Sequence, residues 1–307
     1  MTTERRCPPA LRAGDTVALV ACSGPADPDA VRTGVAVLES WGLRVRVGGT
    51  VRDDRPHPRL DYLAAEDADR ARDFTEAWLD PHVRAVLAAR GGYGSHRMLD
   101  LVDWAALRHA EPTLFAGSSD ATAVHEAVAT HLGVPTVLAA MPATAYFDPV
   151  AAEHLRTTLF APCARRTLPS PAAEPLRAGL ARGRIVGGNL SVLAAGVGTR
   201  ESRPAHGGIA VLEDVGEEPY RIDRLLTHLL RTGWFDDVAG LALGSWSDCG
   251  SDPGAVRAVL CDRLGPLGVP TAWRLDVGHH PGALAVPLGL PAELDAATGT
   301  LTVAPGQ

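Results

Sequence analysis

The sequence lacks lysine altogether and has few aromatic residues, and both shortages restrict what the protein can bind. All 29 basic residues are arginines, Phe, Trp and Tyr make up 5% of the chain, and the net charge is -7. Nucleic-acid-binding surfaces combine a basic stripe with interleaved aromatic side chains, and the sequence contains no such stripe. We therefore expect no nucleic acid as a partner. The absence of lysine also excludes a lysine-containing phosphate loop.

Paired cysteines and long apolar runs are missing as well. The five cysteines are odd in number, lie far apart and form no C-x-x-C pair; they are Cys7, Cys22, Cys163, Cys249 and Cys261. We expect reduced thiols, with neither a disulfide framework nor a metal site. No run reaches the roughly 20 apolar residues that a bilayer span needs, and the N-terminus lacks the apolar core of a signal peptide. The sequence therefore predicts a cytoplasmic protein without a membrane partner.

Short apolar runs alternate with helical patterns over the first half of the chain. The segments "TVALVACSG", "VRAVLAARGGYGS" and "PTLFAGSSD" are typical of buried strands that end in turns, and helical spacing follows them. This alternation predicts an α/β domain with a parallel sheet covered on both faces. Ligands bind outside the carboxyl ends of such strands. Two glycine-containing turns, at 91–94 and 117–120, fall at those ends.

The length of 307 residues favours two domains. We expect an N-terminal α/β domain over 1–164 and a linker over 165–183, where Pro, Ala and Arg are frequent and periodicity is weak. Residues 184–307 mix short strands with about three helices. This predicts a smaller, β-rich C-terminal domain.

The turn Gly117-Ser118-Ser119-Asp120-Ala121 joins an expected strand to an expected helix. Its simplest interpretation is a helix cap, because Ser and Asp side chains accept hydrogen bonds from free backbone N–H groups. It is also close to the G-x-S-x-G turn, in which small neighbours let a strained backbone raise the middle serine above the sheet. The neighbouring "RGGYG" turn offers a further backbone N–H to an oxyanion. Both interpretations stay open from these residues alone.

Two downstream residues at strand ends suit the remaining roles of a catalytic triad. Glu213 follows the apolar run "IAVL", and His279 lies in "DVGHHPG". Glu213 could equally be a surface acid at the start of a helix, and His279 with His280 could be turn residues or a metal pair. Adjacent histidines rarely point the same way and no third ligand is suitably spaced, so we expect no metal. The order Ser, Glu, His is compatible with acyl transfer but does not establish it.

The chain resembles the LD-carboxypeptidases, a serine peptidase family that also contains the microcin C immunity hydrolases. The resemblance extends over nearly the whole length and rests on blocks in a fixed order: "LRAGDTVALVACSGP", "ARGGYGSHRMLD", "GSSDATAV", "GRIVGGNLSVLAAGVGT", "VLEDVGEEPYRIDRLLTHL", "GLALGSWSDC" and "DVGHH". It implies a nucleophile-bearing N-terminal domain, a smaller C-terminal domain that supplies Glu and His, an active site between them, and a homodimer.

By position, the resemblance assigns the nucleophile to Ser119, the carboxylate to Glu213 and the base to His279. It assigns the oxyanion donors to the N–H of Asp120 and to a glycine of the Gly91–Gly92 pair, of which we take Gly92. The sequence departs from the family at Ser118, where an aromatic residue is usual. The histidine turn also lacks an asparagine that often follows it.

We therefore expect a serine carboxypeptidase without cofactor that releases the terminal D-alanine from peptidoglycan tetrapeptides. An alternative within the family is a microcin C immunity-like hydrolase of peptidyl or aminoacyl adenylate analogues. That activity would favour an aromatic platform in the linker region, and 161–190 contains no Trp or Tyr. Alternatives of other classes are a catalytically silent protein that binds a small ligand and a nucleotide-dependent oxidoreductase, for which no dinucleotide fingerprint is present.

Overall fold

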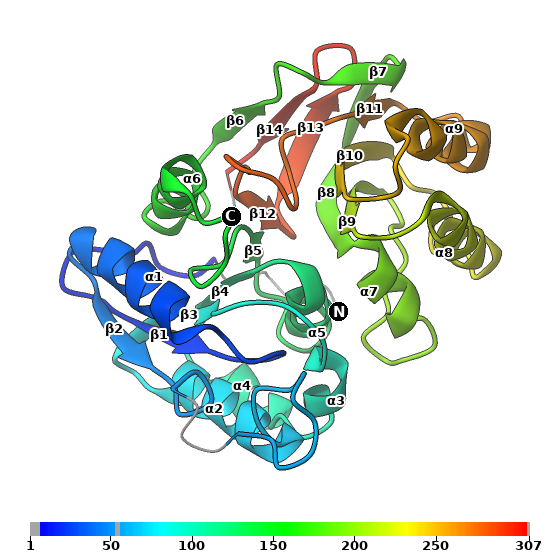
Figure 1. Cartoon of the computed structure of the whole chain (residues 1–307). Helices are drawn as coiled ribbons and strands as arrows, with labels where there is room; N and C mark the ends of the chain where they lie inside the picture. The colour runs from blue at the N-terminus through cyan, green and yellow to red at the C-terminus, as the bar shows by residue number, and fades with distance from the viewer. Residues whose placement is uncertain (1–6, 53–55, 306–307) are drawn as a thin grey trace.

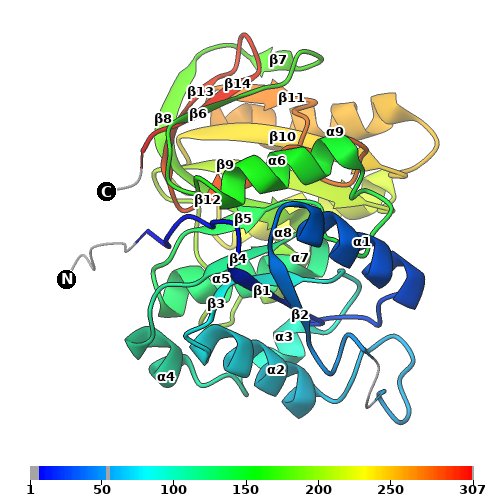
Figure 2. The same cartoon turned by 90° about the vertical axis from the view of Figure 1, so that its left-hand side faces the viewer.

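The computed structural model describes residues 7–52 and 56–305 and contains two sheets, one above the other in Figure 2. The first sheet has the strand order β12-β5-β4-β3-β1-β2. Strands β1 to β5 run parallel, and β12 pairs antiparallel with β5. The strands are β1 (Thr16–Val20), β2 (Arg44–Val47), β3 (Val83–Ala88), β4 (Leu114–Gly117), β5 (Thr136–Leu138) and β12 (Val286–Leu288). The predicted parallel α/β sheet is thus confirmed.

Helices cover both faces of this sheet, because consecutive strand residues point to opposite sides. Val86 and Phe115 pack with Phe74 of α2 on one face, whereas Leu87 packs with Leu38 of α1 on the other. The helices are α1 (Pro28–Ser40), α2 (Asp67–Leu79), α3 (Ser95–Leu99), α4 (Trp104–His109), α5 (Thr122–His131) and α6 (Pro149–Leu159).

The second sheet has the order β6-β14-β13-β8-β9-β10-β11-β7 (Figure 1). Its centre, β8 to β11, is parallel, and antiparallel strands complete both sides. The strands are β6 (Arg166–Pro169), β7 (Glu174–Arg177), β8 (Leu180–Asn189), β9 (Gly208–Val215), β10 (Gly240–Ser247), β11 (Thr271–Trp273), β13 (Pro291–Asp295) and β14 (Thr300–Val303); the helices are α7 (Leu190–Gly196), α8 (Pro219–Arg231) and α9 (Pro253–Leu264).

The segment 165–183, expected to be a linker, is part of this second sheet. It contains β6, β7 and the first residues of β8. Strand β7 pairs with β11 and β6 pairs with β14, both of which come from the far end of the chain. The prediction of a linker failed because half-exposed edge strands need little apolar periodicity: their partners, not their own pattern, determine their conformation.

Two features connect the halves of the molecule. Strand β12 belongs to the first sheet although the sequence around it lies in the C-terminal half, and apolar residues of β5 and β12 join the core of the second sheet. A disulfide also joins Cys7 to Cys163, 156 residues apart. The expectation of five free thiols is therefore wrong for these two cysteines. The pairing depends on the N-terminal segment running alongside the end of α6, where the N–H of Leu11 donates to the carbonyl of Leu159.

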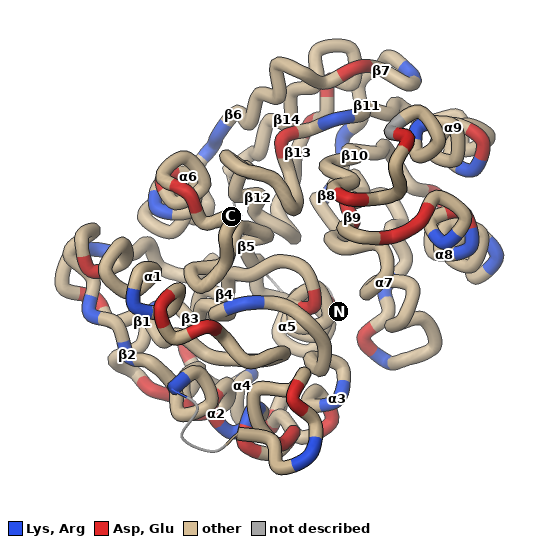
Figure 3. Tube along the Cα trace, in the orientation of Figure 1, with Lys and Arg blue, Asp and Glu red and all other residues tan. Residues whose placement is uncertain are grey.

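Acidic and basic residues are distributed over both halves of the molecule (Figure 3). Among the described residues, no helix is long and apolar enough to cross a membrane.

Candidate active site

Ser119 lies on a sharp turn between β4 and α5. Its backbone φ is 58°, a left-handed conformation that non-glycine residues rarely adopt and that is concentrated at functional sites. A Cβ on Gly117 would come within 2.8 Å of the Ala121 Cβ, so the turn requires glycine at its first position. Ser118 is buried and has an extended backbone, whereas Ser119 is partly exposed. The geometry of a nucleophile turn therefore falls on Ser119.

The buried side chain of Asp120 holds this turn in place through hydrogen bonds to neighbouring loops. Its Oδ2 accepts hydrogen bonds from Ser23 Oγ at 2.6 Å and from the backbone N–H of Ser95 at 2.8 Å. Ser23 follows β1 and Ser95 begins α3, so one carboxylate ties together three loops at the same edge of the sheet. From the sequence a role was expected only for the Asp120 backbone, and neither Ser23 nor Ser95 was expected at the site. The pattern "ACSGP" after the first strand was the only available signal for Ser23.

The glycine pair lies beside the same serine. A Cβ on Gly91 would lie 2.7 Å from both Cβ and Oγ of Ser119 and 3.5 Å from the Asp120 nitrogen. Gly92 has a φ of +115° and approaches Gly24 instead. The backbone N–H groups of Gly92 and Asp120 donate to no acceptor within the described part of the chain. The turn therefore leaves both amides available to a ligand.

Glu213 and His279 come together in the interior of the C-terminal half. His279 Nδ1 and Glu213 Oε2 are 2.6 Å apart, Glu213 is 0% exposed and His279 is 9% exposed. Gly278 makes this approach possible, because a Cβ there would lie 2.7 Å from Glu213 Oε2. Ser247 Oγ also donates to the carbonyl of His279 and holds its backbone.

The electrostatics of this pair favour the protonated imidazole. Burial by itself lowers the pKa of His279, but the hydrogen bond to Glu213 and the negative charges of Glu213 and Asp214 outweigh it, so the pKa lies above its ordinary value. Burial raises the pKa of Asp214 to about 6, and the charge of Glu213 adds to this effect. The site can therefore accept a proton at His279 and stabilise the resulting charge.

Contacts between the two halves bring the serine turn toward this pair. The Asn189 N–H donates to Thr122 Oγ1 at 3.0 Å, which joins the start of α5 to the end of β8, and Asn189 lies opposite Glu213 in the sheet. Tyr146 contacts the His279 ring edge-on at a centroid distance of 5.6 Å. Thr122 and Tyr146 were not expected at the site, because no local motif marks either residue.

Ser119 and His279 do not share a hydrogen bond in this structure, where, among the described residues, the His279 ring bonds only to Glu213. In serine hydrolases without ligand this bond is often long or poorly aligned and shortens when substrate binds. The described residues contain no cluster of three or more His, Cys, Asp or Glu side chains able to hold a metal ion.

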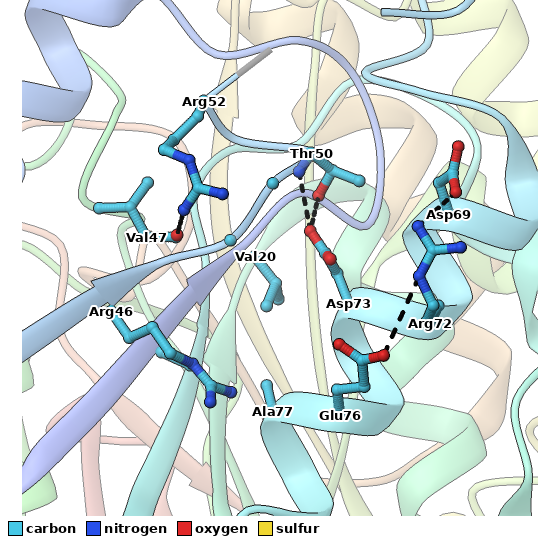
Figure 4. A pocket seen from close by; sticks show the side chains of 13 residues that line it. Val20, Arg46, Val47, Thr50, Arg52, Asp69, Arg72, Asp73, Glu76 and Ala77 are labelled. Atoms are coloured by element: carbon cyan, nitrogen blue, oxygen red, sulfur yellow. Dashed lines mark hydrogen bonds and ion pairs between the residues drawn. The ribbon is translucent and has the colours of Figure 1, made fainter. Parts of the chain in front are cut away.

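A separate polar cavity of about 440 Å³ lies between β2, α2 and the loop after β2 (Figure 4). Its charged groups bind to one another, to nearby side chains or, for Arg52, to the backbone carbonyl of Val47. Asp73 accepts from the N–H and hydroxyl of Thr50 at 2.8 and 2.7 Å, and Arg72 pairs with Asp69. This arrangement is typical of a surface ion-pair network, and we do not assign it to the site.

Family models and relatives cover almost the entire chain. The model of the LD-carboxypeptidase N-terminal domain matches residues 17–139, and that of the C-terminal domain matches residues 182–294. A Streptomyces coelicolor protein that carries the name of a carboxypeptidase is 53% identical over 96% of this chain and 95% of its own. The murein tetrapeptide carboxypeptidase of Pseudomonas aeruginosa is 29% identical over 91% of this chain and 92% of its own.

Solved structures show the same architecture. A protein from Bacillus anthracis described as similar to MccF superposes with a TM-score of 0.87 at 20% identity, covering 98% of this chain and 99% of that one. Muramoyltetrapeptide carboxypeptidase from Oxalobacter formigenes superposes with a TM-score of 0.81 at 27% identity, covering 94% and 98%.

Proposed function

The chain belongs to the LD-carboxypeptidase family of serine peptidases, and we propose that it releases the terminal D-alanine from peptidoglycan tetrapeptides through Ser119, His279 and Glu213. The observation that carries this proposal is the buried 2.6 Å hydrogen bond between His279 and Glu213. This bond pairs the proposed base, His279, with a carboxylate, and the same chain holds Ser119 in a left-handed backbone conformation. The named relatives that act on murein peptides support the choice of substrate.

In the proposed mechanism, His279 Nε2 removes the proton of the Ser119 hydroxyl as its oxygen attacks the scissile carbonyl carbon. Glu213 keeps the remaining proton on Nδ1 and stabilises the imidazolium. The N–H groups of Gly92 and Asp120 donate to the oxyanion. Collapse of the tetrahedral intermediate transfers the proton from His279 to the leaving amine of D-alanine and leaves an acyl-enzyme. Water activated by His279 then hydrolyses the ester.

The left-handed backbone of Ser119 also favours it over Ser118 as the nucleophile. Because Ser118 is buried and extended, its hydroxyl is less accessible to a substrate. Ser119→Ala should abolish turnover and Ser118→Ala should retain most of it, with both variants folded by circular dichroism. The opposite pattern would refute the assignment.

The deciding experiment is mass spectrometry of L-Ala-γ-D-Glu-meso-diaminopimelyl-D-Ala incubated with the wild-type protein and with Ser119→Ala. We expect loss of one alanine with the wild type alone. Release of a different fragment, or loss of alanine with both proteins, would contradict the proposed reaction.

Hydrolysis of aminoacyl adenylate analogues is the second candidate. The observation in its favour is that the indoles of Trp246 and Trp273 line a cavity next to the histidine turn, with ring centroids 6.5 Å apart. Such rings can stack on a nucleobase. Cleavage of an aspartyl sulfamoyl adenosine, together with failure to cleave the tetrapeptide, would establish this activity in place of the first.

The homodimer and the cytoplasmic location stay predictions. The Cys7–Cys163 disulfide is an observation against the location, because disulfides are rare in a reducing cytosol. Sedimentation of the purified protein would decide whether its mass is twice the 32.1 kDa of one chain.

A further inference from the structure

His125 is a buried histidine on α5 that the proposed mechanism does not use, and its side chain is 1% exposed. Its Nε2 lies 3.0 Å from the carbonyl oxygen of Gly117, and its Nδ1 lies 2.8 Å from Oγ1 of Thr136. Gly117 is the last residue of β4 and Thr136 is the first residue of β5. The ring therefore bonds to two neighbouring strands, and one of its partners is the residue that opens the serine turn.

These two partners determine which ring nitrogen carries the proton. A carbonyl oxygen only accepts hydrogen bonds, so the proton is on Nε2, and the unprotonated Nδ1 accepts from the hydroxyl of Thr136. Burial lowers the pKa of His125 to about 4, so the ring stays uncharged where the ordinary histidine pKa would begin to protonate it. His125 is thus a fixed donor to the carbonyl of Gly117.

The carbonyl of Gly117 does not need His125 to satisfy it. It already accepts from the backbone N–H of Ala139 at 3.0 Å, next to the pairing of β4 with β5. With two donors, both lone pairs of this oxygen are used, and the orientation of the peptide group between Gly117 and Ser118 is fixed. The bond from His125 therefore orients this peptide group beyond what the strand pairing requires.

This peptide group begins the turn that carries Ser119. The φ of 58° at Ser119 is strained, and a strained backbone persists only where the surrounding contacts over-determine it. After the serine, the carboxylate of Asp120 holds the turn through two hydrogen bonds. Before the serine, His125 holds it through the carbonyl of Gly117.

We propose that His125 is a positioning residue for the nucleophile, and that its bond to Gly117 fixes the turn from which the Ser119 hydroxyl attacks the scissile carbonyl. It acts through the backbone and takes no part in proton transfer, because both of its nitrogens are already bonded within the core. The inference rests on the proposed role of Ser119 as the nucleophile. It does not depend on which acyl group the serine attacks.

Two amide substitutions separate the two bonds of the ring. The amide nitrogen of Gln is as many bonds from Cβ as Nε2 of histidine, so His125→Gln can still donate to Gly117. The amide group of Asn is as many bonds from Cβ as Nδ1, so His125→Asn keeps a partner for Thr136 and loses the bond to Gly117.

His125→Asn should lower kcat by about 10- to 100-fold, the effect of misplacing a reacting group by up to about 1 Å. Its KM should change less than about twofold, because the substrate contacts stay in place. His125→Gln should keep kcat within about threefold of the wild-type value. Each kcat is measured as D-alanine release from the tetrapeptide per folded molecule, with the folded fraction taken from near-ultraviolet circular dichroism at the assay temperature.

His131→Asn is the matched control, because His131 is on the same helix and its Nε2 bonds to Glu201 at 2.8 Å instead of to the serine turn. Its kcat should stay within about twofold of the wild-type value. A merely structural role of His125 would lower the folded fraction and leave kcat per folded molecule unchanged.

An unchanged kcat in His125→Asn, or a change in its KM alone, overturns the proposal. A loss in His125→Gln or in His131→Asn as large as that in His125→Asn also overturns it, because the loss would then not depend on the bond to Gly117. If the wild type does not release D-alanine, the proposed function fails, and the variants are compared with aspartyl sulfamoyl adenosine as the substrate. Cleavage of neither substrate by the wild type overturns both.

Discussion

Replacing Glu213 by Gln tests the most specific feature of the site, the buried bond between Glu213 and His279. The substitution keeps the size of the side chain and removes its charge. Glutamine has two ways to face His279. It can keep an oxygen toward Nδ1 and bury an NH2 group where Glu213 Oε1 now has no partner, or it can turn the NH2 toward Nδ1 and favour the wrong tautomer of the ring.

The size of the effect follows from this choice. Loss of a hydrogen bond to a charged group costs about 1.5–3 kcal/mol, which is roughly a 10- to 100-fold loss of rate. When the wrong tautomer also forms, the corresponding carboxylate-to-amide change in serine proteases lowers kcat by about 10⁴-fold. We expect kcat of Glu213→Gln to fall by between about 10-fold and 10⁴-fold.

The pH dependence supplies a second signature. The acid limb of kcat/KM reports the pKa of the free enzyme's base, here His279, which must be neutral to act. Burial lowers this pKa and Glu213 raises it, so the wild-type limb should lie above the ordinary histidine value of about 6.5. Without the charge of Glu213, burial dominates and the limb should move to lower pH.

The assay is the release of D-alanine from the tetrapeptide between about pH 5 and 9, a range that brackets the ordinary histidine pKa of about 6.5. Glu218→Gln is the control. Glu218 is an exposed carboxylate in the loop between β9 and α8, five residues after Glu213, and it makes no side-chain cap for α8. A lower rate without a downward shift of the acid limb would refute the role of Glu213 in raising the pKa of His279. An unchanged rate would refute its role in catalysis.

Three further substitutions test the turn, a buried acid and the disulfide. Gly91→Ala should lower kcat by about 100-fold, because a Cβ there would lie 2.7 Å from Ser119 Oγ. The control Gly265→Ala should leave kcat unchanged, because a Cβ there meets nothing within 4 Å. Equal kcat values for the two variants would contradict this prediction. Burial raises the pKa of Asp214 to about 6, so the folded state holds a proton that the unfolded state has lost. The free energy of unfolding should therefore fall as the pH rises from about 4 to 6. In urea unfolding, Asp214→Asn should lack this dependence of the free energy on pH. Cys7→Ser opens a disulfide that spans 156 residues and should lower the free energy of unfolding by ~3–5 kcal/mol, so an unchanged urea midpoint would count against a structural disulfide.

The local sequence pattern was sufficient to predict secondary structure and turns where a residue's conformation depends on its near neighbours in the chain. The alternation of apolar runs and helical spacing predicted the parallel first sheet, because strands buried on both faces need continuous apolar sequence. The small residues around Ser119 left both a helix cap and a strained turn open, and the φ of 58° agrees with the strained turn. Pattern failed at 165–183, where weakly apolar edge strands pair with β11 and β14 from the end of the chain.

The sequence by itself determined the α/β class, the family and the residue types available for acyl transfer, since periodicity and ordered motifs record local physical requirements. Only the tertiary structure decided which of these residues meet. It placed Glu213 against His279, put the Asp120 carboxylate beneath the serine turn, and joined Cys7 to Cys163. Such contacts link residues far apart in the chain, and they form only when sheet pairing and core packing fix the relative positions of the strands and loops that carry them.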